Sequence, residues 1–197
     1  NYRYDVLAKL EIKDGEQFIL WNMEPSWEHG YSSKEDHWQR IFSTADILQE
    51  TGIKVIISLH PLCKLENYTL LEERQNFTIS RSVSIFELVP LSLFSVSFCC
   101  STNFLADFFK IDLVLFDWLG MASSTGPSFI DHAIEYATRV ETHDQLEETI
   151  NMIIARNLAK PSEFFLDDYS PACPQIAEEL ISLVNSNPVN TKSWKIS

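Results

Sequence analysis

The chain has 197 residues, of which 45% are hydrophobic, and its formal net charge is −13 at pH 7. This size and composition fit one globular domain with a sizeable core, and the negative charge argues against a nucleic-acid surface, which needs clustered Lys and Arg. No apolar run approaches the roughly 20 residues that cross a bilayer. The start of the chain is mixed and charged, unlike a signal peptide, and its four irregularly spaced cysteines suggest reduced thiols. We therefore expect a cytoplasmic protein, with peripheral attachment to the inner membrane face as the alternative.

Strands are predicted where apolar, β-rich runs occur along the chain. These runs are Phe18–Trp21, Lys54–Leu59, Phe77–Ile79, Leu93–Phe98 and Leu113–Phe116, with a further candidate at Ala137–Val140. Runs such as VIISL and LVLF show no polar alternation, as expected for strands that are covered on both faces. Residues 1–17 precede the first strand, and we expect them to be a linker or the remnant of an interdomain connection.

Helical patterns lie between these strands. Ser33, with Asp36 three residues later, gives a capping-box-like start to a helix that Gly52 closes. Its predicted apolar stripe consists of Trp38, Ile41, Phe42, Ala45 and Leu48.

Two further helices are predicted in the last third of the chain. One opens at Thr142, with Gln145 three residues later, and runs through Ile154; the other covers Pro174–Val184. Between them, residues 157–173 are expected to form a linker. The alternation of strands and helices predicts an α/β fold: one doubly wound, mostly parallel, Rossmann-like domain over residues 18–156, with a linker and closing helix over 157–197.

His60 ends an apolar strand and is followed directly by Pro61. Because proline disfavours the α region for the preceding residue, the imidazole is presented at a fixed place at the carboxyl end of the strand. In doubly wound folds, ligands bind outside these strand ends, near the point where the strand order reverses. His60 is therefore either a ligand-binding residue or a histidine that merely ends a strand, and the sequence leaves both open.

Polar residues follow other predicted strands as well. The loop after the first strand carries Glu24, Glu28 and His29, although Trp27 and Tyr31 could simply bury that histidine.

Arg81 follows the third strand, and together with Lys64 it is the best-placed cation for neutralising a diphosphate. After the fourth strand, Ser101 and Thr102 open a predicted helix, where hydroxyls and backbone N–H groups favour a phosphate. The alternative for these two residues is ordinary helix capping. Asp117 ends the fifth strand and could also line the crevice, although an aspartate at a strand end is also ordinary turn chemistry.

Several common sites are disfavoured. The sequence has neither GxGxxG nor a Walker loop, which argues against ordinary dinucleotide and P-loop sites. It has no G-x-S-x-G, so the nucleophile elbow of serine hydrolases is missing. His60-x-x-Cys63 with Cys99 and Cys100 matches no structural zinc pattern, and we expect no metal.

The order and spacing of these signals resemble a known family. The matching pieces are SLHP at Ser58–Pro61, SIFELVP at Ser84–Pro90 and CCSTNFLADFF at Cys99–Phe109. Together they resemble the C-terminal, nucleotide-sugar-binding half of GT-B-fold glycosyltransferases, particularly bacterial transferases of surface and capsular polysaccharide biosynthesis. They are similar too to the non-hydrolysing UDP-N-acetylglucosamine 2-epimerases, which share that half. EPSWEHG at Glu24–Gly30 looks like the first phosphate-side loop of the domain.

The resemblance implies roles for individual residues. It implies that His60 contacts the donor phosphates and that Ser101 and Thr102 bind phosphate. It also implies that Asp107 lies where the epimerases place an acidic residue that holds the ribose hydroxyls. A protonated His60 could add to the stabilisation of the leaving nucleotide.

The candidate site residues fall into two groups. Those proposed as catalytic are His60, Glu28 and His29. Those proposed to bind the nucleotide are Ser101, Thr102, Asp107 and Arg81. The sequence departs from the family pattern at Leu62, Cys100 and Asp112, where the relatives usually carry a polar residue, serine and proline respectively.

Three functional hypotheses follow. The first is a glycosyltransferase domain that takes a sugar from a UDP- or CMP-linked donor to a glycan acceptor, with no tightly bound cofactor. The second is an epimerase-like domain, and the third is a non-catalytic α/β module that binds a partner or forms an oligomer. Because only one GT-B half fits in this length, the N-terminal half is expected on another chain, removed, or absent.

Overall fold

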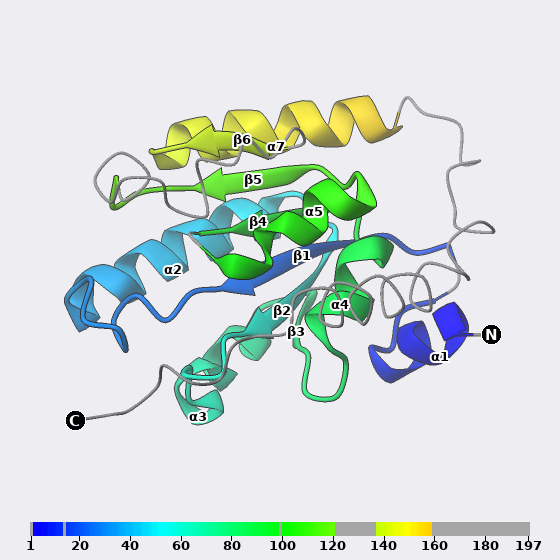
Figure 1. The fold of residues 1–197 in the computed structure, drawn as a ribbon, viewed down its shortest axis with the longest axis horizontal. Coiled ribbons are helices and arrows are strands. Elements are labelled where there is room, and N and C mark those ends of the chain that lie inside the picture. The colour runs from blue at the N-terminus through cyan, green and yellow to red at the C-terminus, as the bar shows by residue number, and fades with distance from the viewer. Residues whose placement is uncertain (1, 14, 99, 121–136, 159–197) are drawn as a thin grey trace, which may run out of the picture. The chain divides into compact units, whose positions relative to one another are not determined.

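A six-stranded sheet with the strand order β3-β2-β1-β4-β5-β6 forms the centre of the structure, and every neighbouring pair is parallel (Figure 1). The computed structural model describes residues 2–13, 15–98, 100–120 and 137–158. The strands are β1 Phe18–Met23, β2 Lys54–Leu59, β3 Phe77–Ile79, β4 Phe94–Ser97, β5 Leu113–Phe116 and β6 Ala137–Val140. This is the strand order of a doubly wound Rossmann-type fold, so the predicted fold class is confirmed.

Helices cover both faces of the sheet. They are α1 Tyr2–Lys9, α2 Lys34–Glu50, α3 Leu65–Tyr68, α4 Ile85–Leu88, α5 Phe104–Phe109 and α7 His143–Leu158. Short 3₁₀ turns add η1 Thr69–Glu73, η2 Val89–Leu91 and η3 Ser101–Asn103. The caps follow the sequence: the Ser33 hydroxyl accepts the Asp36 N–H at 3.0 Å, and Thr142 accepts the Gln145 N–H at 3.3 Å.

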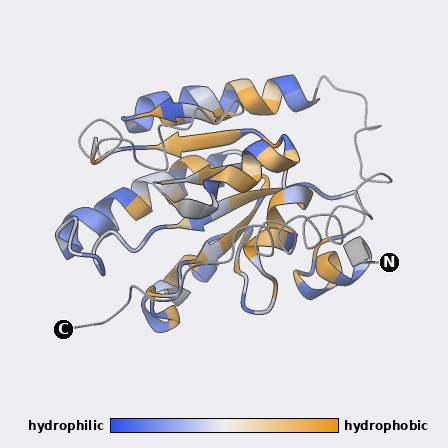
Figure 2. Cartoon of the chain, in the orientation of Figure 1, coloured by the Kyte–Doolittle hydropathy of each residue, from blue (hydrophilic) through white to orange (hydrophobic). Residues whose placement is uncertain are grey.

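Two hydrophobic cores lie on the two faces of the sheet. Alternate residues of β1 face opposite ways: Ile19 and Trp21 pack with α2 and α7, whereas Phe18 and Leu20 pack with α1, α4 and α5. Hydrophobic residues accordingly concentrate in the strands and between the layers (Figure 2). Burial on both faces explains why the strands read as continuous apolar runs.

Most predicted strand boundaries are confirmed, with small differences. β1 runs two residues further than predicted, to Met23, because Asn22 keeps its backbone pairing with Ser58 on one side and Ser97 on the other. The predicted stripe of α2 needs a correction: Phe42 is exposed, while His37 and Thr44 are buried.

The two ends of the predicted domain also differ. Tyr2–Lys9, expected in a linker, form α1, and the buried residues Val6 and Leu7 make this helix part of the core. The compact unit runs from Asn1 to Leu158, because α7 continues through the first two residues of the predicted C-terminal linker. The rest of that linker and the predicted helix Pro174–Val184 lie outside the described residues. No helix in the described ranges has the length and apolar character needed to span a membrane.

Candidate functional site

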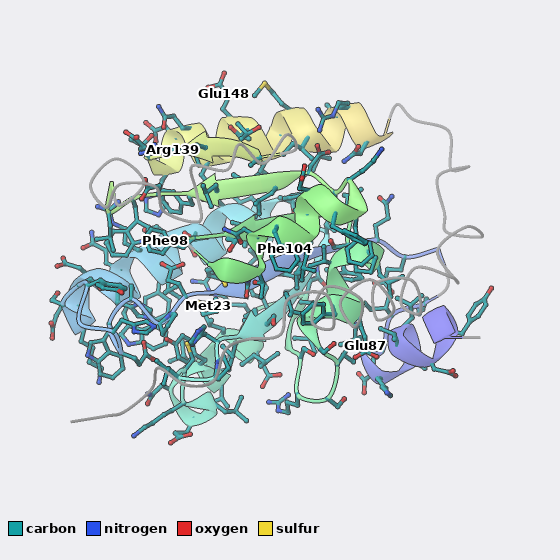
Figure 3. All side chains as sticks on the ribbon, viewed as in Figure 1. Met23, Glu87, Phe98, Phe104, Arg139 and Glu148 are labelled. Atoms are coloured by element: carbon teal, nitrogen blue, oxygen red, sulfur yellow. The ribbon has the colours of Figure 1, made fainter. Side chains whose placement is uncertain are left out.

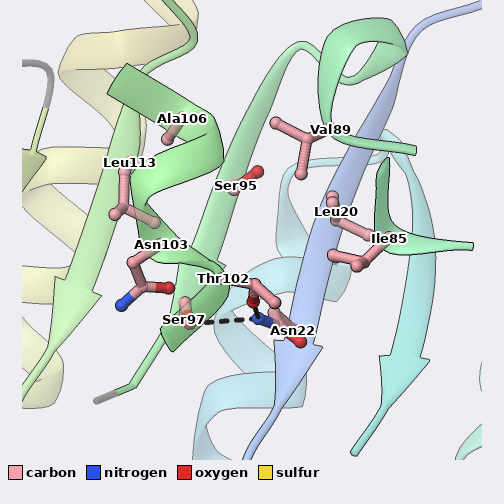
Figure 4. A pocket seen from close by; sticks show the side chains of 10 residues that line it. All are labelled: Leu20, Asn22, Ile85, Val89, Ser95, Ser97, Thr102, Asn103, Ala106 and Leu113. Atoms are coloured by element: carbon pink, nitrogen blue, oxygen red, sulfur yellow. Dashed lines mark hydrogen bonds between the residues drawn. The ribbon is translucent and has the colours of Figure 1, made fainter. Parts of the chain in front are cut away.

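The strand order reverses between β1 and β4, and polar side chains gather at the carboxyl ends of these two strands. The Asn22 amide nitrogen donates to the Thr102 hydroxyl at 3.0 Å and lies 3.5 Å from the Ser97 hydroxyl (Figure 4). Thr102 Oγ1 also lies 3.1 Å from the Cys100 sulfur, and Asn103 donates to the Phe98 carbonyl at 2.7 Å. The end of β1 and the stretch from Ser97 to Asn103, which are far apart in the sequence, therefore present polar groups together at the switch point, where ligands of this fold class bind.

A small cavity lies directly behind this cluster. Its lining includes Asn22, Ser97 and Thr102 on the polar side and Ile85 and Val89 on the apolar side (Figure 4). Its volume of about 10 Å³ suits a single water. A nucleotide bound here must therefore lie outside the strand ends rather than within this cavity.

His60 lies one strand away, at the carboxyl end of β2. Its ring is held by the Leu62 N–H, which donates to Nδ1 at 3.2 Å. Because Nδ1 accepts this hydrogen bond, the neutral ring carries its proton on Nε2. Burial and the neighbouring His29 lower the pKa of His60, and Glu28 opposes that shift. His60 is therefore a neutral Nε2–H donor, and protonation at Nδ1 would set two N–H groups against each other.

His29 lies close to His60, as the sequence predicts for two members of one site. The two ring centroids are 5.7 Å apart in an edge-to-face arrangement. On its other side, His29 stacks against Tyr31 with centroids 5.3 Å apart. His29 and Tyr31 are both exposed, so the alternative that the aromatic residues bury His29 is wrong.

Glu28 belongs to the same loop, but its carboxylate is turned toward the interior. The Tyr68 hydroxyl donates to Glu28 Oε1 at 2.9 Å, and Tyr68 also lies 3.0 Å from His37 Nε2. His37 Nδ1 in turn lies 2.7 Å from the Ser26 hydroxyl. Tyr68, His37 and Ser26 are almost fully buried. No local pattern in the sequence predicts this network, because its members come from a loop, α2 and α3.

Glu24 follows β1 directly and occupies a different environment. The Trp118 indole donates to Glu24 Oε1 at 3.0 Å, and the Arg40 guanidinium lies over the Trp118 ring at 5.2 Å from its centroid. Burial raises the pKa of Glu24 to about 7, opposed by the Trp118 hydrogen bond. A carboxyl group that titrates near neutral pH thus lies beside the switch point.

Arg81 lies at the edge strand and is engaged in a bidentate ion pair. Both of its terminal nitrogens donate to Glu72, one of them to Oε1 at 2.9 Å. This pairing raises the pKa of Arg81 and lowers the pKa of Glu72. A phosphate would have to compete with the Glu72 carboxylate, so Arg81 is poorly placed for the role predicted from the sequence.

The remaining candidates are spread along α5 and the later strands. Asp107 is exposed on α5, and the Ser101 backbone lies in η3. Asp117 is buried and forms a 2.8 Å ion pair with Arg139. Arg139 lies toward the same carboxyl edge of the sheet as Phe98 (Figure 3). Among the described residues, no three His, Cys, Asp or Glu side chains come together as metal ligands.

Two of the described arginines at this edge already have a carboxylate partner. Arg81 is paired with Glu72 and Arg139 with Asp117, while Arg40 lies over the ring of Trp118. An anion at this edge would therefore be bound mainly by neutral donors such as His60 Nε2–H and the hydroxyl of Thr102. A hydrogen bond from a neutral donor to a charged acceptor contributes roughly 1.5–3 kcal/mol.

No protein-family model matches the sequence, and no curated protein matches it. Among solved structures, the UDP co-structure of MnaA from S. aureus is similar, with a TM-score of 0.54 and 11% identity over 97% of this chain and 50% of that chain. UDP-GlcNAc 2-epimerase from Methanocaldococcus jannaschii, in complex with UDP-GlcNAc and UDP, has a TM-score of 0.56 and 11% identity over 94% and 52%. The calicheamicin glycosyltransferase CalG4 has a TM-score of 0.50 and 13% identity over 88% and 43%.

These identities show the fold alone. The chain spans about half the length of each of these proteins. Its fold is therefore that of a GT-B half-domain of the kind also found in the epimerase, which confirms the fold-level resemblance drawn from the HP, IFELVP and Ser-Thr motifs.

Proposed function

We propose that this chain is the nucleotide-sugar-binding half of a GT-B-type glycosyltransferase and holds a UDP-linked donor at the carboxyl edge of its sheet. The observation that carries the proposal is the hydrogen-bonded pair of Asn22 and Thr102 at the β1/β4 switch point, with His60 at the carboxyl end of the neighbouring strand β2. Fold neighbours whose structures contain UDP support this choice of nucleotide. A CMP-linked donor is the alternative, and surface-polysaccharide synthesis is the proposed setting.

The proposed chemistry is electrostatic. As the sugar leaves, negative charge grows on the nucleotide phosphate, and preorganised donors stabilise it. His60 supplies its Nε2–H from a ring that the Leu62 N–H already orients. Thr102 is similarly oriented by the Asn22 amide, which leaves its own O–H free to turn toward the phosphate or toward the Cys100 sulfur.

A second Rossmann-like half would complete the active site, as a partner chain or as part of a longer protein. It would hold the glycan acceptor and supply the base that deprotonates it. The epimerase-like alternative uses the same UDP-binding edge, so nucleotide affinity does not separate the two. Once both halves are present, the two hypotheses are distinguished by the product: a transferase moves the sugar to an acceptor, whereas an epimerase converts the free nucleotide sugar.

Thermal unfolding with UDP, CMP, GDP and ADP at millimolar concentration tests the proposal. We expect UDP to raise the melting temperature selectively, because a ligand at about 100 times its Kd adds roughly 2.7 kcal/mol to the free energy of unfolding. His60→Ala should weaken UDP binding about 10- to 100-fold, the equivalent of one hydrogen bond to a charged group. His60→Gln, which retains an N–H donor, should recover part of that loss. A well-folded protein that responds to none of the four nucleotides would contradict the proposal.

A further inference from the structure

The buried network behind Glu28 has a defined direction. A carboxylate can only accept, so the single proton of the Tyr68 hydroxyl goes to Glu28 Oε1. Tyr68 must then accept from His37 Nε2–H, which leaves Nδ1 to accept from the Ser26 hydroxyl. Ser26 accepts in turn from Ser32 at 3.3 Å. Each hydrogen bond of this network is therefore donated in the direction of Glu28. The pattern requires a neutral His37 ring, and burial lowers the pKa of His37 accordingly.

The other oxygen of the same carboxylate is buried and has no hydrogen-bond partner among the described residues. This atom is Glu28 Oε2. An unsatisfied buried acceptor is costly, and such groups in folded proteins call for an explanation. The Glu28 residue as a whole is only half-buried, and its charge is close enough to His60 to oppose the lowering of that histidine's pKa.

The position and charge of this oxygen restrict which part of a nucleotide sugar can satisfy it. A carboxylate repels the phosphates, so the part that it contacts must be a neutral group with a hydrogen to donate. Glu28 is anchored to Tyr68, in the segment that follows β2, whereas Asp107 lies on the helix that follows β4. β1 lies between these two strands. If the ribose lies toward Asp107 and the phosphates near Thr102 and His60, the sugar lies toward Glu28.

We infer that Glu28 Oε2 accepts a hydrogen bond from a hydroxyl of the sugar carried by the nucleotide, and that Tyr68 and His37 are positioning residues for this contact. The inference rests on the proposed function and adds that the loop after β1 recognises the sugar of the donor. The hydrogen bonds that run from His37 through Tyr68 hold Glu28 Oε1 in place, and this also fixes the position of Oε2. A preorganised acceptor of this kind discriminates strongly against ligands that lack the matching hydroxyl.

The experiment compares UDP with UDP-glucose and UDP-GlcNAc by calorimetry on the wild-type chain and on Glu28→Gln. The substitution preserves shape but can place an NH₂ group where Oε2 was. We expect the affinity for UDP-sugars to fall about tenfold in Glu28→Gln, while the affinity for UDP changes less than about twofold. Tyr68→Phe should weaken UDP-sugar binding in the same direction. The double variant should be no weaker than Glu28→Gln alone, because Tyr68 acts through Glu28.

A test from the ligand side does not depend on the folding of any variant. Deoxy analogues of UDP-glucose, titrated against the wild-type chain, should include one that binds about tenfold more weakly than the parent. Equal losses for UDP and UDP-sugar in Glu28→Gln would assign Oε2 to the nucleoside and overturn the inference, as would no loss for either ligand. A wild-type chain that binds UDP but treats all deoxy analogues alike would overturn it while leaving the proposed function intact. If the wild-type chain binds neither UDP nor UDP-sugar, both fail.

Discussion

Gly30 shows how a single residue shapes the candidate site. It has a φ of +75°, a left-handed conformation that L side chains rarely adopt. The turn that it makes is closed by the Tyr31 N–H, which donates to the Ser26 carbonyl at 2.8 Å. This geometry allows the rings of His29 and Tyr31 to stack although only one residue separates them. The conformation of Gly30 therefore sets where His29 lies relative to His60.

Gly30→Ala should cost stability through its backbone alone, because no atom lies within 4 Å of the added Cβ. We expect the free energy of unfolding to fall by about 1 kcal/mol in urea denaturation. Gly52, with a φ of +67° and equally open surroundings, offers a matched control at the end of α2. Both variants should lose similar stability, but only Gly30→Ala should weaken UDP binding. Equal UDP affinities in the two variants would mean that the turn at Gly30 does not contribute to UDP binding.

Among the elements, α1 departs most from the sequence analysis. Its segment is rich in charge, with Arg3, Asp5 and Lys9, and so looks like a linker. The apolar residues Val6, Leu7 and Leu10 nevertheless share one buried face at helical spacing. Lys54 at the start of β2 fixes the end of this segment, because its ammonium donates to the carbonyls of Leu10 and Glu11 at 3.0 and 2.9 Å.

Substitutions in this segment distinguish a packed helix from a linker. Leu7→Ala should lower the free energy of unfolding by about 2–5 kcal/mol, the usual cost of truncating a buried leucine. Lys54→Met keeps the aliphatic stem but loses both hydrogen bonds, and should cost about 1 kcal/mol because the ammonium is partly exposed. Lys9→Met, at an exposed position of α1, is the matched control. If Leu7→Ala unfolds at the same urea concentration as the wild type, residues 1–17 behave as the linker that the sequence suggested.

For the whole molecule, the fold could be predicted from the sequence far better than the site. Unbroken runs such as VIISL and LVLF identify buried parallel strands, because local composition reports burial on both faces. The end of β1 was missed, because Asn22 is polar yet keeps its place in the ladder between two neighbouring strands.

The site depends on contacts between distant parts of the chain. His60 and His29 could be placed together because both follow neighbouring strands. The Tyr68–His37 contact joins residues 31 positions apart, and a buried histidine or tyrosine carries no local signal of its partner. Arg81 likewise reads as a free cation in the sequence, and only the structure shows that Glu72 already holds it.

The free energy of unfolding of the whole domain should depend on pH partly through the ionisation of Glu24. Its pKa rises from 4.5 in the unfolded chain to about 7 in the fold, chiefly through burial, and Glu28 adds to the rise. Between these two values the native state binds more protons than the unfolded state, so this contribution makes stability fall as pH rises. Above about pH 7 both states are ionised, and the contribution becomes constant.

Glu24→Gln isolates this effect, because His37, His60 and His143, whose pKa values are lowered, contribute an opposite slope to both proteins. The amide can still accept the Trp118 N–H but cannot ionise. We expect the variant to match the wild type near pH 4 and to exceed it by about 1–2 kcal/mol at pH 8. The half-buried state of Glu24 keeps this gain below the roughly 3 kcal/mol of the full pKa difference. Chemical denaturation at both pH values measures it, and a constant difference between the two proteins would mean that Glu24 ionises in the fold as it does in water.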